Sequence, residues 1–218
     1  MPRMATMDRE RRRAQILTIA AEVFAEKGYH DAKIEDIVAR AKVARGTFYL
    51  YFEDKRAIFE ELVSGFVRQL AETIEPIETV PDSDPTRVMF ELRSNLLRLV
   101  ERFMAEPAMA KVLFSAAVGL DADFDRRLLT FYEEVAGLIE RSLEQGEEAG
   151  LVRPGHRRIR AFCLTGIIKE LLYQLILRRA VSEPAELVDT MLDLVTDGLF
   201  TDPARAAVRA SSAPRATR

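Results

Sequence analysis

Apolar side chains recur at three- and four-residue intervals along almost the whole chain, and this spacing constrains the fold more than any other feature. Residues 9–27 show it clearly, with one stripe made of Ile16, Ala20, Val23 and Phe24. No stretch alternates apolar and polar residues in the way that is typical of a half-buried strand. The sequence therefore predicts an all-α protein.

Glycine, proline and capping residues divide this pattern into separate helices. We expect a first helix over residues 9–27, which Gly28 ends, then a second over 34–41 and a short third over 46–52. Asp54 can cap a long fourth helix. Five further helices are expected near residues 86–105, 107–118, 122–149, 156–180 and 184–200, with a break at Gly119 among others. Residues 201–218 show no apolar stripe and predict a disordered tail.

Composition excludes several classes of protein. The 218 residues are 48% hydrophobic and 31% charged, as in a folded globular protein. Cys163 is the only cysteine and is expected in the core. Neither a leader peptide nor a membrane-spanning apolar run is apparent. We therefore expect a cytoplasmic protein without a membrane role. His30 and His156 read as loop residues. In the absence of a nucleophile motif, a phosphate loop or paired metal ligands, we expect no catalytic residue, no metal and no cofactor.

The helices at 34–41 and 46–52, joined by a turn of about four residues, form a helix-turn-helix pattern. The second of them is too short to persist alone, so packing must hold it, and Phe48 and Phe52 lie one turn apart on one side. At about 100° per residue, the opposite side carries Gly46, Thr47, Tyr49 and Leu50. A solvent-facing surface would normally carry Lys, Glu or Gln, so this face indicates a contact with a partner.

A DNA groove suits the residue types on this face. Gly46 permits close backbone approach, the hydroxyls of Thr47 and Tyr49 can donate to phosphates, and Leu50 can touch a thymine methyl. The first 55 residues hold 11 Lys and Arg against nine Asp and Glu, whereas the whole chain has a net charge of −3. This weak charge asymmetry agrees with a DNA-binding N-terminus.

Two cations flank the same segment. Arg45 at the start of the helix can reach guanine with both prongs of its guanidinium. Lys55 lies in the first turn of the fourth helix, where a phosphate could join it and offset its unfavourable position in the helix dipole. The candidate DNA contacts are therefore Arg45, Gly46, Thr47, Tyr49, Leu50 and Lys55.

Three segments carry a family resemblance: FAEKGY at 24–29, IEDIVARA at 34–41 and RGTFYLYFEDK at 45–55. Together they resemble the N-terminal domain of the TetR family of bacterial repressors. The resemblance implies a nine-helix, Ω-shaped homodimer whose first three helices read the major groove. It also implies that Thr47, Tyr49 and Lys55 contact phosphates, and that Arg45, Gly46 and Leu50 approach bases.

The sequence departs from the family pattern at three positions. Lys33 stands where Ser or Thr usually caps the second helix, and Asp31 is a possible substitute cap. Lys42 replaces a frequent glycine in the turn, so the turn is either strained or has a negative φ. Ala44 replaces a frequent serine.

The chain is thus expected to divide into a helix-turn-helix DNA-binding domain at 1–55, a ligand-binding and dimerisation domain at 56–200, and the tail at 201–218. The predicted function is sequence-specific repression at a palindromic DNA operator, relieved by a small-molecule effector that the many phenylalanines suggest is apolar or amphipathic. Aromatic residues on amphipathic helices mostly belong to the core, and the candidate effector contacts among them are Phe66, Phe103, Phe114, Phe131, Tyr132 and Phe162.

The helices near 156–180 and 184–200 are too apolar to serve only one small domain, and they predict a homodimer. The candidate seam consists of Ala161, Thr165, Gly166, Met191, Leu194, Val195 and Gly198. Two alternatives from other classes stay open. One is a helix-turn-helix interaction protein without a specific operator or effector. The other is an all-α enzyme, which no motif in the sequence supports.

Overall fold

The computed structural model describes residues 2–116, 122–178 and 183–212. Within these ranges the regular structure consists of ten α-helices and one π-helical turn, and the extended pairing is limited to a bridge between Val152 and Phe200. The all-α prediction is confirmed. The predicted ends at 118 and 180 and the break at Gly119 lie outside the described residues.

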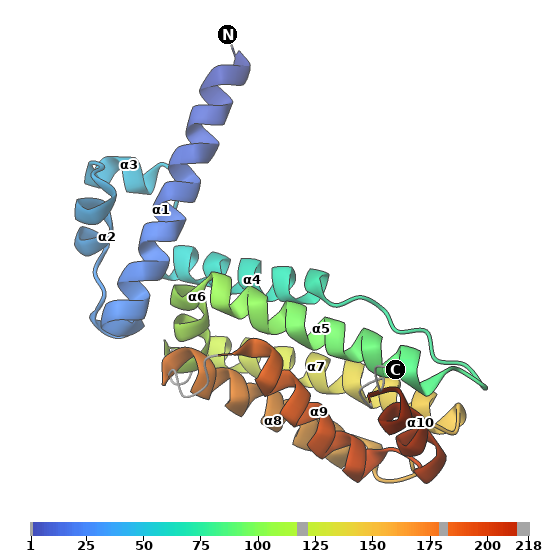
Figure 1. Cartoon of the computed structure of the whole chain (residues 1–218). Coiled ribbons are helices and arrows are strands. Elements are labelled where there is room, and N and C mark those ends of the chain that lie inside the picture. The colour runs from blue at the N-terminus through green and yellow to red at the C-terminus, as the bar shows by residue number, and fades with distance from the viewer. Residues whose placement is uncertain (1, 117–121, 179–182, 213–218) are drawn as a thin grey trace. The chain divides into compact units, whose positions relative to one another are not determined.

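The N-terminal helices are α1 (Pro2–Asp31), α2 (Ile34–Ala41), α3 (Arg45–Tyr49) and α4 (Lys55–Thr73) (Figure 1). They are followed by α5 (Pro85–Ala105), α6 (Pro107–Lys111), the π-helical turn η1 (Val112–Ala116) and α7 (Ala122–Glu148). The C-terminal helices are α8 (Arg157–Leu177), α9 (Pro184–Leu199) and α10 (Asp202–Ser212). Gly28 interrupts α1 with φ 76° and ψ 162°, a left-handed φ that favours glycine, so the predicted helix stop is observed there.

The chain packs into two compact units. The first comprises Met1–Ala71 and Phe103–Leu128, and the second comprises Glu72–Arg102 and Leu129–Arg218. Most of α4 therefore packs with α1–α3, beyond the boundary at residue 55 that the motif suggested. Phe59 of α4 explains this assignment, because it is fully buried and its ring lies 5.2 Å from that of Phe24.

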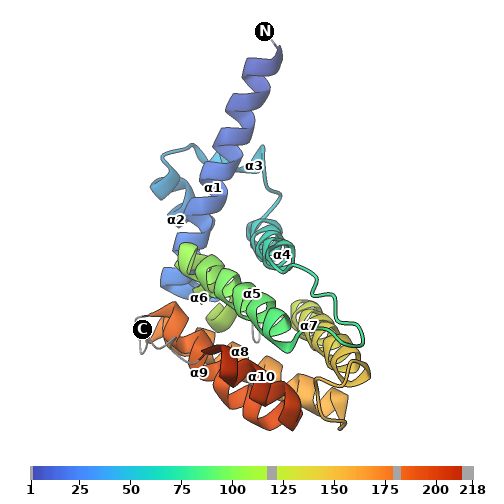
Figure 2. The ribbon, with the colours of Figure 1, turned by 45° about the vertical axis from the view of Figure 1, so that its right-hand side comes forward.

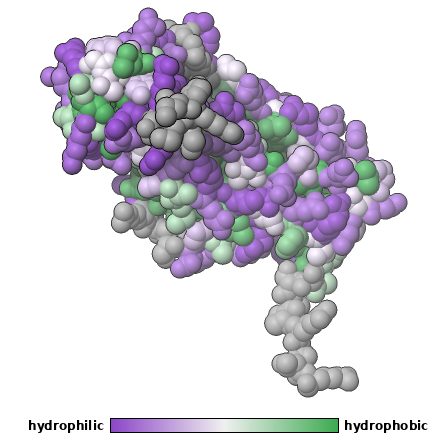
Figure 3. Space-filling model, turned by 90° about the horizontal axis from the view of Figure 1, so that it is seen from above, coloured by the Kyte–Doolittle hydropathy of each residue, from purple (hydrophilic) through white to green (hydrophobic). Residues whose placement is uncertain are grey.

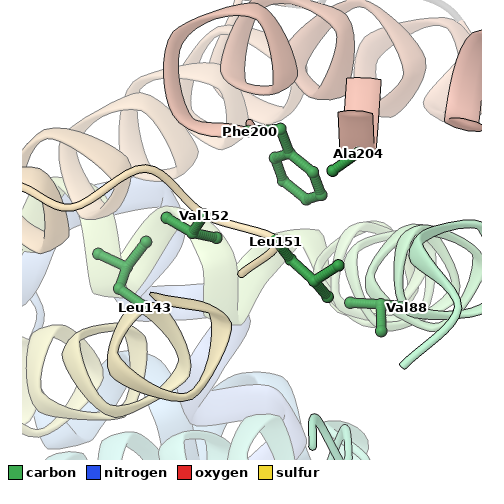
Figure 4. Packing of buried hydrophobic residues seen from close by; sticks show 6 residues of the cluster. All are labelled: Val88, Leu143, Leu151, Val152, Phe200 and Ala204. Carbon is green, nitrogen blue, oxygen red and sulfur yellow. The ribbon is translucent and has the colours of Figure 1, made fainter. Parts of the chain in front are cut away.

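A hydrophobic cluster in the second unit gathers residues that are far apart in the sequence (Figure 4). Its buried members are Val88, Leu143, Leu151, Val152, Phe200 and Ala204. They come from α5, from α7, from the loop after α7 and from the segment that enters α10. The cluster shows how the C-terminal segment is fixed to the unit.

The prediction of a disordered tail is wrong for residues 202–212, which form α10. Alanine and arginine favour helix, and Pro203 is tolerated in a first helical turn. Ala204 is buried, and the backbone N–H of Thr201 donates to Leu151 O at 2.9 Å. Ala204, Ala207 and Val208 also form a short apolar stripe that faces inward, and the prediction of disorder overlooked it. Residues 213–218 lie outside the described part.

The described helices include none that is both long enough and apolar enough to cross a membrane. On the face shown in Figure 3, hydrophilic residues predominate and hydrophobic ones are scattered among them.

Candidate functional site

Helices α2 and α3 pack beside α1 in the first unit and are joined by a turn over residues 42–44 (Figures 1 and 2). Lys42 adopts the left-handed conformation, with φ 54° and ψ 46°. The backbone N–H of Val43 donates to Val38 O at 3.1 Å and ends α2. The turn is therefore the strained alternative, and the lysine costs about 1 kcal/mol compared with glycine.

The N-terminus of α2 is capped by a residue that the sequence reasoning did not consider. The backbone N–H of Lys33 donates to Asp36 Oδ2 at 2.9 Å, so Asp36 rather than Asp31 supplies the carboxylate. Lys27 of α1 donates to the other oxygen at 2.6 Å. That hydrogen bond is the main reason why the pKa of Asp36 lies below its usual value. The spacing of three residues between Lys33 and Asp36 is that of a capping box and was the available signal.

One side of α3 is buried and the other is exposed, as its sequence predicted. Phe48 is fully buried, and its ring lies 5.7 Å from that of Phe52. On the opposite side, Leu50 is 70% exposed and Tyr49 is 46% exposed. Gly46 is also exposed, and a Cβ built on it would meet no atom within 4 Å. We call Gly46, Thr47, Tyr49 and Leu50 the α3 face, and none of its members is acidic.

Arg45 lies at the edge of the α3 face. Its Nη1 is 2.8 Å from Glu35 Oε1 of α2, and its guanidinium lies 5.9 Å from the centre of the Tyr49 ring. A hydrogen bond with the Tyr49 side chain and, after it, the charge of Glu35 raise the pKa of Arg45. Both charged groups of the pair are more than half exposed, so water screens the ion pair and it can open for a ligand.

The sequence reasoning did not foresee the surroundings of Lys55. Its ammonium donates to three backbone carbonyls at the end of α1 and just beyond it: Tyr29 O at 2.7 Å, Ala32 O at 2.9 Å and His30 O at 3.2 Å. The same Nζ lies 4.4 Å from the centre of the Tyr29 ring. Burial lowers the pKa of Lys55, and the charge of Asp31 opposes that shift. Since an ammonium has three donors, all of them are used.

The six aromatic candidates for effector binding fall into two groups. In the first unit the Phe103 ring lies 5.3 Å from that of Phe66 and 5.5 Å from that of Phe114, and Phe66 and Phe103 are buried. In the second unit Phe131 and Tyr132 are neighbours, with ring centres 5.5 Å apart. The first group therefore packs as a core would.

Tyr132 and Phe162 line a hollow of about 220 Å³ in the second unit. The other lining residues are Leu129, Glu133, Thr165, Gly166 and Lys169. The Lys169 ammonium lies 5.4 Å from the centre of the Tyr132 ring, and burial raises the pKa of Tyr132. Phe162 is about half exposed and Leu129 is 65% exposed, so the hollow is an open site rather than an enclosed cavity.

One side of α8 is exposed, although its sequence suggested burial on several sides. Ile159 and Phe162 are about half exposed, and Leu194 of α9 is 69% exposed. Cys163 is exposed as well, so its predicted place in the core is wrong. The physical reason is that Cys163 falls on the side of α8 that the described part of the chain leaves uncovered.

A short helix with a non-acidic exposed face, held by α1 and α2 and followed by a second helical unit, defines a helix-turn-helix transcription regulator. The family model for bacterial regulatory proteins of the tetR family matches residues 16–62, the segment that contains α2 and α3. Residues 16–62 therefore have the sequence of a tetR-family regulatory protein.

Relatives of nearly the same length support this assignment. An uncharacterised HTH-type transcriptional regulator of Bacillus subtilis, YdgC, is 27% identical over 86% of this chain and 92% of its own. The HTH-type transcriptional repressor DhaR of a Mycobacterium species is 26% identical over the same shares. The crystal structure of the regulator FadR from Bacillus subtilis in complex with stearoyl-CoA has the same fold, with a TM-score of 0.66, 23% identity and coverage of 85% of this chain and 98% of its own.

Proposed function

We propose that this protein is a homodimeric repressor that binds a palindromic operator through α3 and leaves it when a small molecule binds. The α3 face carries the proposal, because an exposed leucine and tyrosine next to a glycine are costly in water and suit a DNA groove. The similarity to DhaR, which is named a repressor, supports the direction of regulation. Because the operator would lie in chromosomal DNA, the proposal places the protein in the cytoplasm.

In this proposal Thr47 and Tyr49 bind phosphates, and Arg45, Gly46 and Leu50 approach bases. Lys55 does not bind phosphate here, since its three donors are used inside the first unit. A two-fold dimer places half-site centres about 34–36 Å apart on the DNA.

The uncovered side of α8 and α9 is the proposed dimer contact. Leu194 and Gly198 of the predicted seam are exposed and available to a second copy, whereas Ala161 and Met191 are buried within the protomer. Gly166 of the seam is exposed as well, but it lines the hollow beside Phe162. Small residues allow close approach of the paired helices, and Leu194 adds apolar area.

The hollow beside Tyr132 and Phe162 is the proposed effector contact. Its walls are mostly apolar and carry the Lys169 ammonium and the Glu133 carboxylate, which pairs with Arg158, so they suit an amphipathic molecule. The structure of FadR, which shares this fold, contains stearoyl-CoA, and a ligand of that size would extend beyond 220 Å³. To act, an effector must prefer the released state by about 1–3 kcal/mol.

A gel-shift assay against DNA that flanks the protein's own gene tests the proposal. We expect retardation of one palindromic fragment at a salt concentration where scrambled DNA stays free, and reversal by an amphipathic ligand. If no fragment is retarded even at low salt, the chain is instead a helix-turn-helix interaction protein. A further outcome is that the fragment is retarded while no ligand in a screen of fatty acids, acyl thioesters and apolar drugs releases it. In that case the proposed effector response is wrong, and the proposed operator binding stands.

Gly46→Ala is expected to separate folding from DNA binding. The free protein has space for the added methyl group, and alanine favours helix by up to about 1 kcal/mol, so the free energy of unfolding should stay the same or rise. Operator affinity should fall at least about tenfold, because a methyl group would meet the groove floor. Urea unfolding and gel shifts measure the two effects, and unchanged affinity would remove Gly46 from the interface.

A further inference from the structure

The first turns of α1 continue beyond α2 and α3 (Figure 1). On this segment the guanidinium of Arg9 lies 5.9 Å from the centre of the Tyr51 ring. Tyr51 lies two residues beyond the end of α3, in the turn that leads to α4. Arg9 is thereby placed beside the segment that directly follows the α3 face.

Helical geometry separates the arginines of this segment into two sides. With Arg9 at 0°, Arg13 lies at about 40° and Arg12 at about 300°, so all three share the side of α1 that is buried further along the helix. Arg11 lies at about 200°, on the opposite side. The side that faces the α3 segment therefore carries three of the four arginines in residues 9–13.

The three arginines on this side differ in their partners. Arg13 pairs with the carboxylate of Glu61 through two hydrogen bonds and lies over the Phe52 ring, so its charge is neutralised within the unit. Arg12 donates to the neutral amide oxygen of Gln15 at 2.7 Å. In the described part of the chain no carboxylate lies within ion-pair distance of Arg9 or Arg12. Two exposed positive charges therefore have no ionic partner among the described side chains.

We propose that Arg9 and Arg12 extend the DNA interface and bind backbone phosphates next to the groove that α3 enters. The inference rests on the proposed function, and it adds a contact that the helix-turn-helix motif does not contain. Guanidinium groups bind phosphate oxygens with two parallel hydrogen bonds, and the Tyr51 ring orients Arg9 for such a contact. Contacts of this kind add affinity without reading sequence.

The salt dependence of DNA binding tests this contact. The variants are Arg9→Gln, Arg12→Gln and their combination, with Arg11→Gln as a matched control that removes the same charge from the opposite side. For each lost phosphate contact, the slope of log K against log salt should become shallower by about 0.9. At about 100 mM salt, Arg9→Gln should weaken binding about three- to tenfold, by the same factor on operator and on random duplex.

Two results overturn the inference. One is a double variant with the same slope as Arg11→Gln, and the other is a loss of affinity that depends on the operator bases. Measurements on random duplex keep the test independent of the proposed function. If the wild-type protein prefers no operator, the proposed repressor function is wrong. The comparison of salt slopes on random duplex still decides the role of Arg9 and Arg12. Unchanged circular dichroism and melting temperature confirm that the variants fold.

Discussion

Lys55→Met is expected to lower the free energy of unfolding by about 2 kcal/mol. The wild-type ammonium donates to the carbonyls of Tyr29, His30 and Ala32, and hydrogen bonds from a charged donor contribute about 1.5–3 kcal/mol. Methionine keeps an apolar stem of similar length but leaves these acceptors to water or without a partner. Urea unfolding with a constant m-value measures the loss.

The same variant decides whether Lys55 holds the unit together or binds DNA. If it fixes the start of α4 to the end of α1, the folded variant should bind DNA with the wild-type salt slope. A phosphate contact would instead make the slope shallower by about 0.9 and leave stability unchanged. Lys33→Met is the matched control, because it removes an exposed ammonium from the same region and should change stability by less than about 0.5 kcal/mol.

The case of Lys55 shows why some parts of the site could not be predicted from the sequence. A cation in the first turn of a helix is unfavourable with respect to the helix dipole, and a phosphate was a reasonable partner to expect. The actual partners are carbonyls about 25 residues earlier in the chain, at the end of another helix. Local periodicity in the sequence does not show which residues of separate helices contact each other.

The α3 face, in contrast, followed directly from the sequence. Its burial depends on a helical repeat over a few residues, and Phe48 and Phe52 fix which side turns inward. The prediction that Cys163 lies in the core was wrong because its burial depends on contacts between helices. Periodicity showed that α8 is apolar on several sides, but it could not show that the other described helices leave one side of α8 uncovered.

Arg45→Ala is expected to change the order in which operator variants are bound. A two-pronged contact between arginine and guanine contributes about 1–3 kcal/mol of discrimination, so the preference at one position of each half-site should fall by roughly five- to a hundredfold. The Glu35 carboxylate and the Tyr49 ring hold the free guanidinium at the edge of the α3 face, which limits the entropy lost on binding. Competition assays with single-base operator variants measure the preference.

Tyr49→Phe is the matched comparison, because it removes one hydroxyl from the same face and a proposed phosphate contact with it. Tyr49→Phe should weaken binding to all operator variants by a similar factor and preserve the order of their affinities. If Arg45→Ala also weakened all variants equally, its guanidinium would be a phosphate contact like that of Tyr49. Sequence reading would then have to come from Gly46 and Leu50, through shape and a methyl contact alone, and the operator would tolerate many more base changes.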